Sequence, residues 1–532
     1  MIAELGRGTQ PAMSTASPAK PRRVSVIGER APLFWGACVA ISLGVISHLP
    51  MLAMAHEMGG RIVGMPMNAS MWAGMVLILL GVPAAIYGAL PRHRTRHGAD
   101  AGTLYEAPDS TPLGRWHAGV LLVLILGLVI DVMKPATLGF VLPGMSAEYG
   151  ISRATVAWFP FTALVGTTIG SFIWGWLADI YGRRVSILLS TILFISTSIC
   201  GAMPMFELNL LMCFLMGCSA GGMLPVVYTL LAEIMPPRHR SWVLVLVGGT
   251  GLVGGYLAAS GAAHTFEPLF GWRVLWLQGF PTGILLLLLA RLIPESPRFL
   301  AEQGRDAELA DMERKYAIVR RTREPAPADA AVAAQRHGPL TAALTITALS
   351  WSFVNFGLLL WLPLDLQQRG YSSELASGIL ASSALVALPT VMLAAWFYSR
   401  LSSKWTLVGT ILLTLAGLVG ALLPAALLSW PPLLIAVIAM LIVGTNGMIA
   451  VLLPYAAENY PLGIRGRATG LVAGSSKFGG VAVQSFALIG LIPTLSGAAL
   501  ALLLPMAASA GLVTYAGRET RGRSLRELEA QA

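Results

Sequence analysis

Fourteen long apolar runs constrain this chain more than any other feature of its sequence. One helix needs about 20 apolar residues to cross the hydrocarbon core of a bilayer. Only 12% of the 532 residues are charged, against roughly a quarter in soluble domains, so the sequence predicts an all-α polytopic membrane protein and excludes a soluble enzyme. The expected spans are residues 33–54, 70–90, 117–140, 155–178, 186–206, 210–232, 242–263, 273–293, 341–363, 374–398, 405–427, 432–457, 467–489 and 493–516.

The positions of the basic residues predict the orientation of these spans. When successive loops alternate between the two sides of the membrane, all but six of the Lys and Arg residues fall on the side of the N-terminus. Four lie on the opposite side, namely Arg61, Arg153, Arg273 and Arg369. Two lie within spans, namely Lys134 and Lys477. Because cytoplasmic loops carry the excess of basic residues, we expect both termini in the cytoplasm and the chain in a bacterial-type inner membrane. The net charge of +10 then reflects topology and contact with the lipid bilayer, and no nucleic-acid partner is expected.

A repeated motif indicates an internal duplication of six spans. The pattern A-E-x-x-P-x-x-x-R follows the fourth span of each group of six, at 232–240 and again at 457–465. The residues of interest in it are Glu233 and Arg240 in the first copy and Glu458 and Arg465 in the second. Two six-helix halves with a solute site between them are one architecture of rocking transporters.

The predicted organisation follows from this division. It comprises a cytoplasmic tail (1–32), an N-terminal transmembrane hairpin (33–92), a cytoplasmic linker (93–116), a six-helix bundle (117–293), a cytoplasmic interbundle linker (294–340), a second six-helix bundle (341–516) and a cytoplasmic tail (517–532).

The segment G-W-L-A-D-I-Y-G-R-R lies between the second and third spans of the first bundle, at 175–184. Its glycines allow a tight turn and a close helix approach, while its acidic and basic side chains can interact with neighbouring helix ends. We expect a cytoplasmic latch that can form and break. Its residues are Gly175, Asp179, Gly182, Arg183 and Arg184.

This segment resembles the loop signature of the major facilitator superfamily. P-E-S-P-R at 294–298 and E-T-R-G-R-S-L at 519–525 are similar to signatures of its sugar-porter-like and metabolite:proton symporter branches. The resemblance covers about residues 115–528 and implies a major facilitator fold of 12 spans, to which the hairpin adds two. The equivalent loop of the second bundle, at 399–405, lacks the acidic residue, so a second latch of the same type is not expected.

Charged residues within spans are costly, at about 2.5 to 3.5 kcal/mol each on an insertion scale. Asp131 lies near the middle of the span 117–140, and Lys134 follows it by one helical turn. One interpretation is a structural pair in which the two charges neutralise each other. The other is that Asp131 is a proton-coupling carboxylate and that Lys134 either keeps it ionised or binds an anionic substrate. In symporters that the chain resembles, a first-span Asp has the coupling role. Lys477 either extends toward the interface or supplies a charge to the substrate from the second half.

Uncharged polar residues within spans can hydrogen-bond a solute or a neighbouring helix. The candidates are Tyr228, Gln278, Asn355, Asn446 and Gln484.

The outer end of the hairpin is rich in Met and His. Thioether and imidazole groups together suit Cu(I), although Met is also an ordinary apolar filler of helices. We expect packing or assembly here and no metal or cofactor, the proton being the coupling ion. His48, His56 and Met58 are the candidate ligands if a metal binds.

The sequence thus predicts a secondary transporter, with proton symport of a small organic solute, preferably an anion. One alternative is a proton-driven exporter of a metabolite or drug. Another is a sensor or assembly protein that does not transport and that binds a membrane partner through the hairpin. No phosphate-binding loop, catalytic triad or metalloprotease motif occurs, so an enzyme is not expected.

Overall fold

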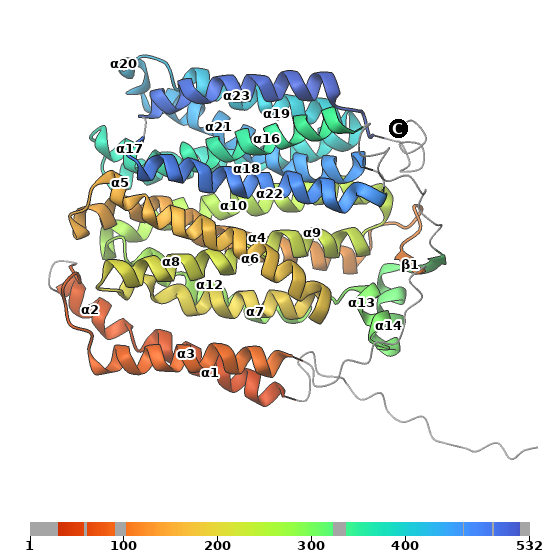
Figure 1. Cartoon of the computed structure of the whole chain (residues 1–532), viewed down its shortest axis with the longest axis horizontal. Coiled ribbons are helices and arrows are strands. Elements are labelled where there is room, and N and C mark those ends of the chain that lie inside the picture. Colours follow the sequence, from red (N-terminus) through yellow and green to blue (C-terminus); the bar gives the residue numbers. More distant parts are fainter. Residues whose placement is uncertain are drawn as a thin grey trace, which may run out of the picture.

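The computed structural model describes residues 30–57, 61–90, 103–322, 337–460, 462–491 and 494–521. Its long helices run side by side along one axis (Figure 1). Thirteen helical stretches of the described chain are long and apolar enough to cross a membrane. A further helix, α22 (Leu462–Leu488), runs among them and is less apolar because it carries Lys477 and Gln484. The predicted fourteen spans are confirmed.

The N-terminal half begins with α4 (Arg115–Tyr149), which is 35 residues long. The remaining elements are α5 (Arg153–Val156), α6 (Trp158–Tyr181), α7 (Arg183–Ser196), η1 (Thr197–Ala202), α8 (Phe206–Ala220), α9 (Met223–Ile234), α10 (Pro237–Phe270), α11 (Val274–Leu277), α12 (Gly279–Leu289) and η2 (Ala290–Leu292). The break between α8 and α9 falls at Gly221, where a Cβ atom would lie 2.3 Å from the carbonyl oxygen of Thr167. The glycine therefore lets this span approach α6 closely.

The C-terminal half repeats this pattern. Its elements are α16 (Gly338–Gly357), η3 (Leu359–Trp361), α17 (Leu362–Gln368), α18 (Ser373–Arg400), α19 (Ser403–Gly420), α20 (Ala425–Leu428), α21 (Pro431–Asn459), α22 and α23 (Leu495–Ala516). The long helix α10 of the N-terminal half packs against α18 and α21, so it forms much of the contact between the halves.

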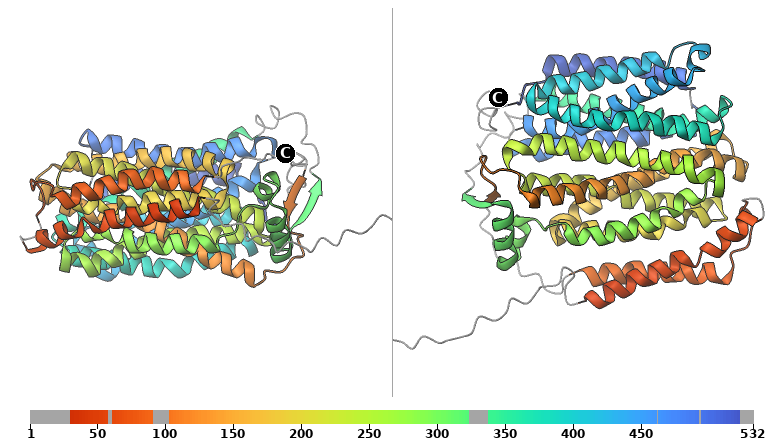
Figure 2. Two further views of the ribbon diagram at one scale, coloured as in Figure 1. Left: turned by 90° about the horizontal axis from the view of Figure 1, so that it is seen from below. Right: turned by 180° about the vertical axis from the view of Figure 1, so that it is seen from behind.

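The hairpin comprises α1 (Ala31–Ile46), α2 (Leu49–Glu57) and α3 (Ala69–Ala89). It lies along α7 at one side of the molecule (Figures 1 and 2). In α7 and η1 together, 89% of the most apolar stretch is buried, against 22% in α3. The hairpin thus covers α7, while much of α3 remains exposed.

A small two-stranded sheet was not predicted. Strands β1 (Thr103–Glu106) and β2 (Val319–Thr322) pair antiparallel, with Thr103 opposite Thr322. They lie with α13 (Pro297–Glu302) and α14 (Asp306–Tyr316) at one end of the bundle, which we term the linker end (Figure 1). The opposite end, where α2 lies, is termed the far end. Each strand has four residues and its partner is remote in sequence, so neither shows a local strand pattern.

Candidate solute site and gates

Asp131 and Lys477 lie in opposite halves of the molecule, within electrostatic range of each other. Asp131, on α4, is 5% exposed, and its charge interacts with that of Lys477 on α22. No ion pair within 4.0 Å joins them in the described chain, and no described residue donates a hydrogen bond to the Asp131 carboxylate. The structure therefore places buried Asp131 and half-buried Lys477 within electrostatic range of each other without a direct ion pair.

Lys134 does not share this region. Its Nζ atom donates hydrogen bonds to the carbonyl oxygen of Phe194 and to Oγ1 of Thr197, the latter at 2.6 Å. The ammonium also lies 4.4 Å from the centre of the Phe194 ring. These partners belong to α7 and η1, so Lys134 points into the N-terminal half, and the alternative that it neutralises Asp131 is wrong.

Two of the predicted uncharged residues donate hydrogen bonds within the protein. Nε2 of Gln278 donates to Oγ1 of Thr137 at 2.9 Å, which links the end of α11 to α4. Nδ2 of Asn446 donates to the carbonyl oxygen of Ile442 within α21 at 3.0 Å. The amide N–H group of each is therefore already used by the protein.

Three other predicted residues retain hydrogen-bonding capacity. The Tyr228 hydroxyl and Oε1 of Gln484 are buried and have no partner among the described residues, although Nε2 of Gln484 donates to the Phe356 carbonyl at 2.7 Å. Asn355 is half-buried and makes no hydrogen bond within the described chain. The sequence missed Tyr256 on α10, whose hydroxyl is also buried without a described partner; the criterion applied to Tyr228 would have found it.

Glycines on α10 bring this helix against both Asp131 and the other half. A Cβ atom at Gly255 would lie 2.6 Å from Cβ of Val132, the neighbour of Asp131. One at Gly249 would lie 2.6 Å from Val391 on α18 of the C-terminal half. The glycine-rich fifth span thus permits close packing at the interface between the halves.

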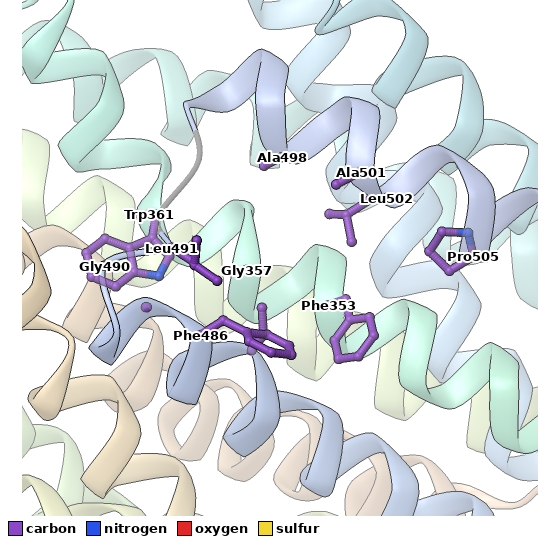
Figure 3. A pocket seen from close by; sticks show the side chains of 12 residues that line it. Phe353, Gly357, Trp361, Phe486, Gly490, Leu491, Ala498, Ala501, Leu502 and Pro505 are labelled. Carbon is purple, nitrogen blue, oxygen red and sulfur yellow. The ribbon is translucent and has the colours of Figure 1, made fainter.

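An apolar cavity of about 580 Å³ lies within the C-terminal half, between α16, α22 and α23 (Figure 3). Its lining residues are Phe353, Gly357, Trp361, Val483, Phe486, Ala487, Gly490, Leu491, Ala498, Ala501, Leu502 and Pro505. It offers no charged side chain for an anion and does not lie between the halves. It is therefore distinct from the region of Asp131 and Lys477.

At the linker end, the predicted latch centres on Arg183. Its Nη1 atom lies 3.0 Å from Asp179, and its Nη2 atom lies 3.2 Å from Glu233. Its backbone N–H donates to Glu295 at 2.7 Å, next to Gly182, whose φ of +98° suits glycine. Burial raises the pKa of the Glu295 carboxyl, against hydrogen bonds from backbone N–H groups. Asp179, Arg183 and Glu233 thus meet in one cluster with Glu295, and their role as a latch stays a prediction.

The other latch residues have different surroundings. Arg184 donates from Nε to the carbonyl oxygen of Ala290 at 2.9 Å, and a Cβ atom at Gly175 would meet nothing within 4 Å. Arg240 pairs with Glu106 of β1 at 3.7 Å. The side chain of Arg465 lies outside the described residues.

In the second half, hydroxyl groups replace the arginine of the latch. Glu458 accepts hydrogen bonds from the hydroxyls of Tyr398 at 2.8 Å and Thr520 at 2.6 Å. Ser241 of α10, in the N-terminal half, lies next to Glu458 at the linker end. At the far end, Arg153 of the N-terminal half donates to Gln368 at 3.0 Å. The halves thus approach each other at the linker end and are hydrogen-bonded at the far end.

Of the candidate metal ligands, His48 is buried between α1 and α2. The side chain of His56, and all of Met58, lie outside the described residues.

Two six-helix halves that meet around opposite charges define a carrier of the kind that moves solutes by rocking. The family model of the Major Facilitator Superfamily matches residues 120–484, and the chain belongs to this superfamily of membrane transporters. The hairpin lies outside that match.

Two of the curated relatives illustrate the similarity, and both are bacterial transporters. The niacin transporter NiaP of Acinetobacter baylyi is 26% identical over 450 residues, which is 79% of this chain and 98% of the relative. The 4-hydroxybenzoate transporter PcaK of Pseudomonas aeruginosa is 29% identical over 438 residues, or 77% and 94%. In fold, the chain is similar to the solved structure of the proton:xylose symporter XylE bound to 6-bromo-6-deoxy-D-glucose, with a TM-score of 0.61 and 18% sequence identity. The similarity covers 78% of this chain and 98% of the symporter chain.

Proposed function

We propose that this protein is a proton-coupled symporter of a small organic anion that works by alternating access. The observation that carries the proposal is the placement of Asp131 and Lys477 on opposite halves, where their charges interact without a direct ion pair. Two charges held in this way can be separated and rejoined as the halves move.

The charge balance of the site explains the coupling. With Asp131 ionised and Lys477 protonated, the buried region is neutral. When a proton binds to Asp131, Lys477 is left with an uncompensated charge, which is costly in a region of low dielectric. A carboxylate solute restores neutrality by binding near Lys477.

The two mixed states of this site are unfavourable. An anion bound beside ionised Asp131 leaves one net negative charge, and protonated Asp131 without an anion leaves one net positive charge. Both bury an unpaired charge, so the halves rearrange most readily in the two neutral states. One proton therefore accompanies each monovalent anion in the same direction.

The relatives favour an aromatic monocarboxylate as the solute. Those with the most extensive coverage are named as transporters of niacin and of 4-hydroxybenzoate. We propose import across a bacterial inner membrane, with the linker end in the cytoplasm, because the basic residues concentrate on that side. The free hydroxyls of Tyr228 and Tyr256 are candidates for contacts with the solute.

Transport by purified protein in liposomes tests the proposal. With an acidic exterior, the wild type should accumulate labelled nicotinate or 4-hydroxybenzoate. Asp131→Asn should abolish accumulation but keep exchange of labelled for unlabelled solute, because a neutral side chain mimics protonated Asp131. Lys477→Gln should weaken both, since the anion loses its cation. Glu302→Gln, which changes a partly exposed side chain on α13, is the matched control.

Three outcomes would contradict the proposal. Accumulation by Asp131→Asn would remove Asp131 as the proton site. Proton-driven movement out of the interior would favour an exporter. Failure of the folded wild type to move any organic anion would favour the sensor or assembly protein.

A further inference from the structure

His48 presents a buried nitrogen lone pair at the far end of the hairpin. The side chain is 1% exposed, and its Nδ1 atom lies 2.8 Å from the carbonyl oxygen of Gly44. A carbonyl oxygen only accepts hydrogen bonds, so Nδ1 carries the proton. The other nitrogen, Nε2, is then an acceptor in the neutral ring, and it is buried without a partner among the described residues.

A hydrogen bond from Nδ1 to a backbone carbonyl is the arrangement that orients a histidine for metal ligation through Nε2. It fixes both the tautomer and the ring plane before any ligand binds. His48 therefore has the form of a preorganised ligand.

Buried thioethers lie next to this histidine. Met51, one helical turn after His48 on α2, is 2% exposed, and Met71 on α3 is 0% exposed. With Ile62 they form a small cluster separate from the main core, against which Met65 and Met67 pack.

The imidazole also abuts α3 close to Met71. A Cβ atom at Gly74, one turn after Met71, would lie 2.8 Å from Cε1 of His48. Imidazole and thioether groups from three elements of the hairpin thus occupy one small region.

The loop between α2 and α3 closes this region. The backbone N–H groups of Ile62 and Val63 donate to Glu148 on α4 at 2.7 and 3.3 Å. A turn at Gly64, with φ of +83°, returns the chain so that Met65 N–H donates to the Ile62 carbonyl at 3.0 Å. The transport half itself therefore holds the loop over the methionines.

We propose that this region binds one soft monovalent metal ion of the Cu(I) class. The ligands are Nε2 of His48 and the Sδ atoms of Met51 and Met71, with Met65 or Met67 completing the set. Thioether and imidazole ligands in an apolar shell select Cu(I). In the described chain no three His, Cys, Asp or Glu side chains converge to hold an ion, so hard divalent cations have no competing site of that kind. The bound ion joins α2 to α3 and rigidifies the far end of the hairpin.

Competition for Cu(I) tests this site in the purified full chain. With Cu(I) presented as its bicinchoninate complex under reducing conditions, the wild type should withdraw one equivalent. His48→Gln and Met71→Leu should each weaken this binding at least tenfold. Met216→Leu, which changes a buried methionine of the transport half, should leave it unchanged. Ag(I) should raise the melting temperature of the wild type but not that of Met71→Leu.

Two results would overturn the assignment. The folded wild type could fail to withdraw Cu(I), or His48→Gln and Met71→Leu could both bind it as the wild type does. If His48→Gln does not fold, Met51→Leu and Met71→Leu decide the question, because exchange of Met for Leu preserves volume and is usually tolerated in cores. This test is independent of solute transport.

Discussion

At the scale of residues, two basic side chains on α4 and α22 have opposite surroundings. Lys134 is 2% exposed and bonded to Thr197 and the Phe194 carbonyl, whereas Lys477 interacts electrostatically with Asp131. A buried ammonium with satisfied hydrogen bonds contributes to structure, and one that faces an untied carboxylate can change partners. We therefore assign structure to Lys134 and function to Lys477.

This assignment predicts a separation of effects. Lys134→Met should lower stability by about 1 to 3 kcal/mol, because the buried Phe194 carbonyl and Thr197 hydroxyl lose this donor. The solute concentration that gives half-maximal uptake should change less than about threefold, because the Lys134 ammonium does not face the proposed solute site. Thermal unfolding and uptake rates measure these effects. A folded Lys134→Met protein that no longer binds solute would show that Lys134 belongs to the site.

A second prediction concerns Glu519, beyond the last span. Burial acts to raise its pKa, but hydrogen bonds from Ser402, Ser403 and backbone N–H groups outweigh this and hold the pKa below its ordinary value. Its contribution to stability is then present above the ordinary pKa of about 4.3 and is lost as the pH falls through the lower folded value.

Melting temperature as a function of pH checks this sign. Glu519→Gln should be less stable than the wild type at pH 7, by about 1 kcal/mol for each lost hydrogen bond, and the difference should shrink as the pH falls below 4. Glu302→Gln, which alters an exposed pair with Arg298, should follow the wild type. A difference that grows with acidity would contradict the account.

At the scale of elements, the sequence predicts every span but not every end. Apolar windows locate helix centres, while polar residues at helix ends stay helical, so α10 begins at Pro237 and ends at Phe270, beyond the expected span 242–263. The sheet of β1 and β2 escaped prediction because its pairing is non-local. Local patterns report burial along one helix and give little information on such remote contacts.

The site shows the same limit. Asp131, Lys134 and Lys477 stand out in the sequence because charges in spans are rare. Which lysine interacts with Asp131 could not be predicted from spacing. The long side chain of a Lys one turn away, such as Lys134, can extend toward a different neighbouring helix. The placement of Lys477 opposite Asp131 depends on how the two halves pack, which no local rule specifies.

Two ion pairs that anchor separate elements should differ in strength. Glu148 and Arg273 pair at 2.6 Å, with side chains 6% and 5% exposed, and Glu148 also holds the hairpin loop. Glu106 and Arg240 pair at 3.7 Å, with side chains 36% and 21% exposed. Glu148→Gln should cost about 3 to 5 kcal/mol because it leaves a buried arginine unpaired. Glu106→Gln should cost at most about 1 kcal/mol, as for surface pairs. Unfolding in detergent measures both, and equal losses would refute this ranking.

At the scale of the whole molecule, the two halves meet at both ends and carry opposite charges between them. Ser241 lies next to Glu458 at the linker end, and Arg153 donates to Gln368 at the far end, so rocking would separate these contacts alternately. The hairpin binds to the N-terminal half through α7 and Glu148, so it should move with that half. In the proposed mechanism, the neutral states of Asp131 and Lys477 determine when the halves rearrange.

The most direct test of this account is the number of protons that enter with each anion. Liposomes that contain the purified protein would report proton uptake with an internal pH dye and solute uptake with labelled nicotinate or 4-hydroxybenzoate. The account predicts one proton per monovalent anion for the wild type, and anion exchange without net proton movement for Asp131→Asn. Anion accumulation without proton entry in the wild type, or unchanged proton entry in Asp131→Asn, would contradict it.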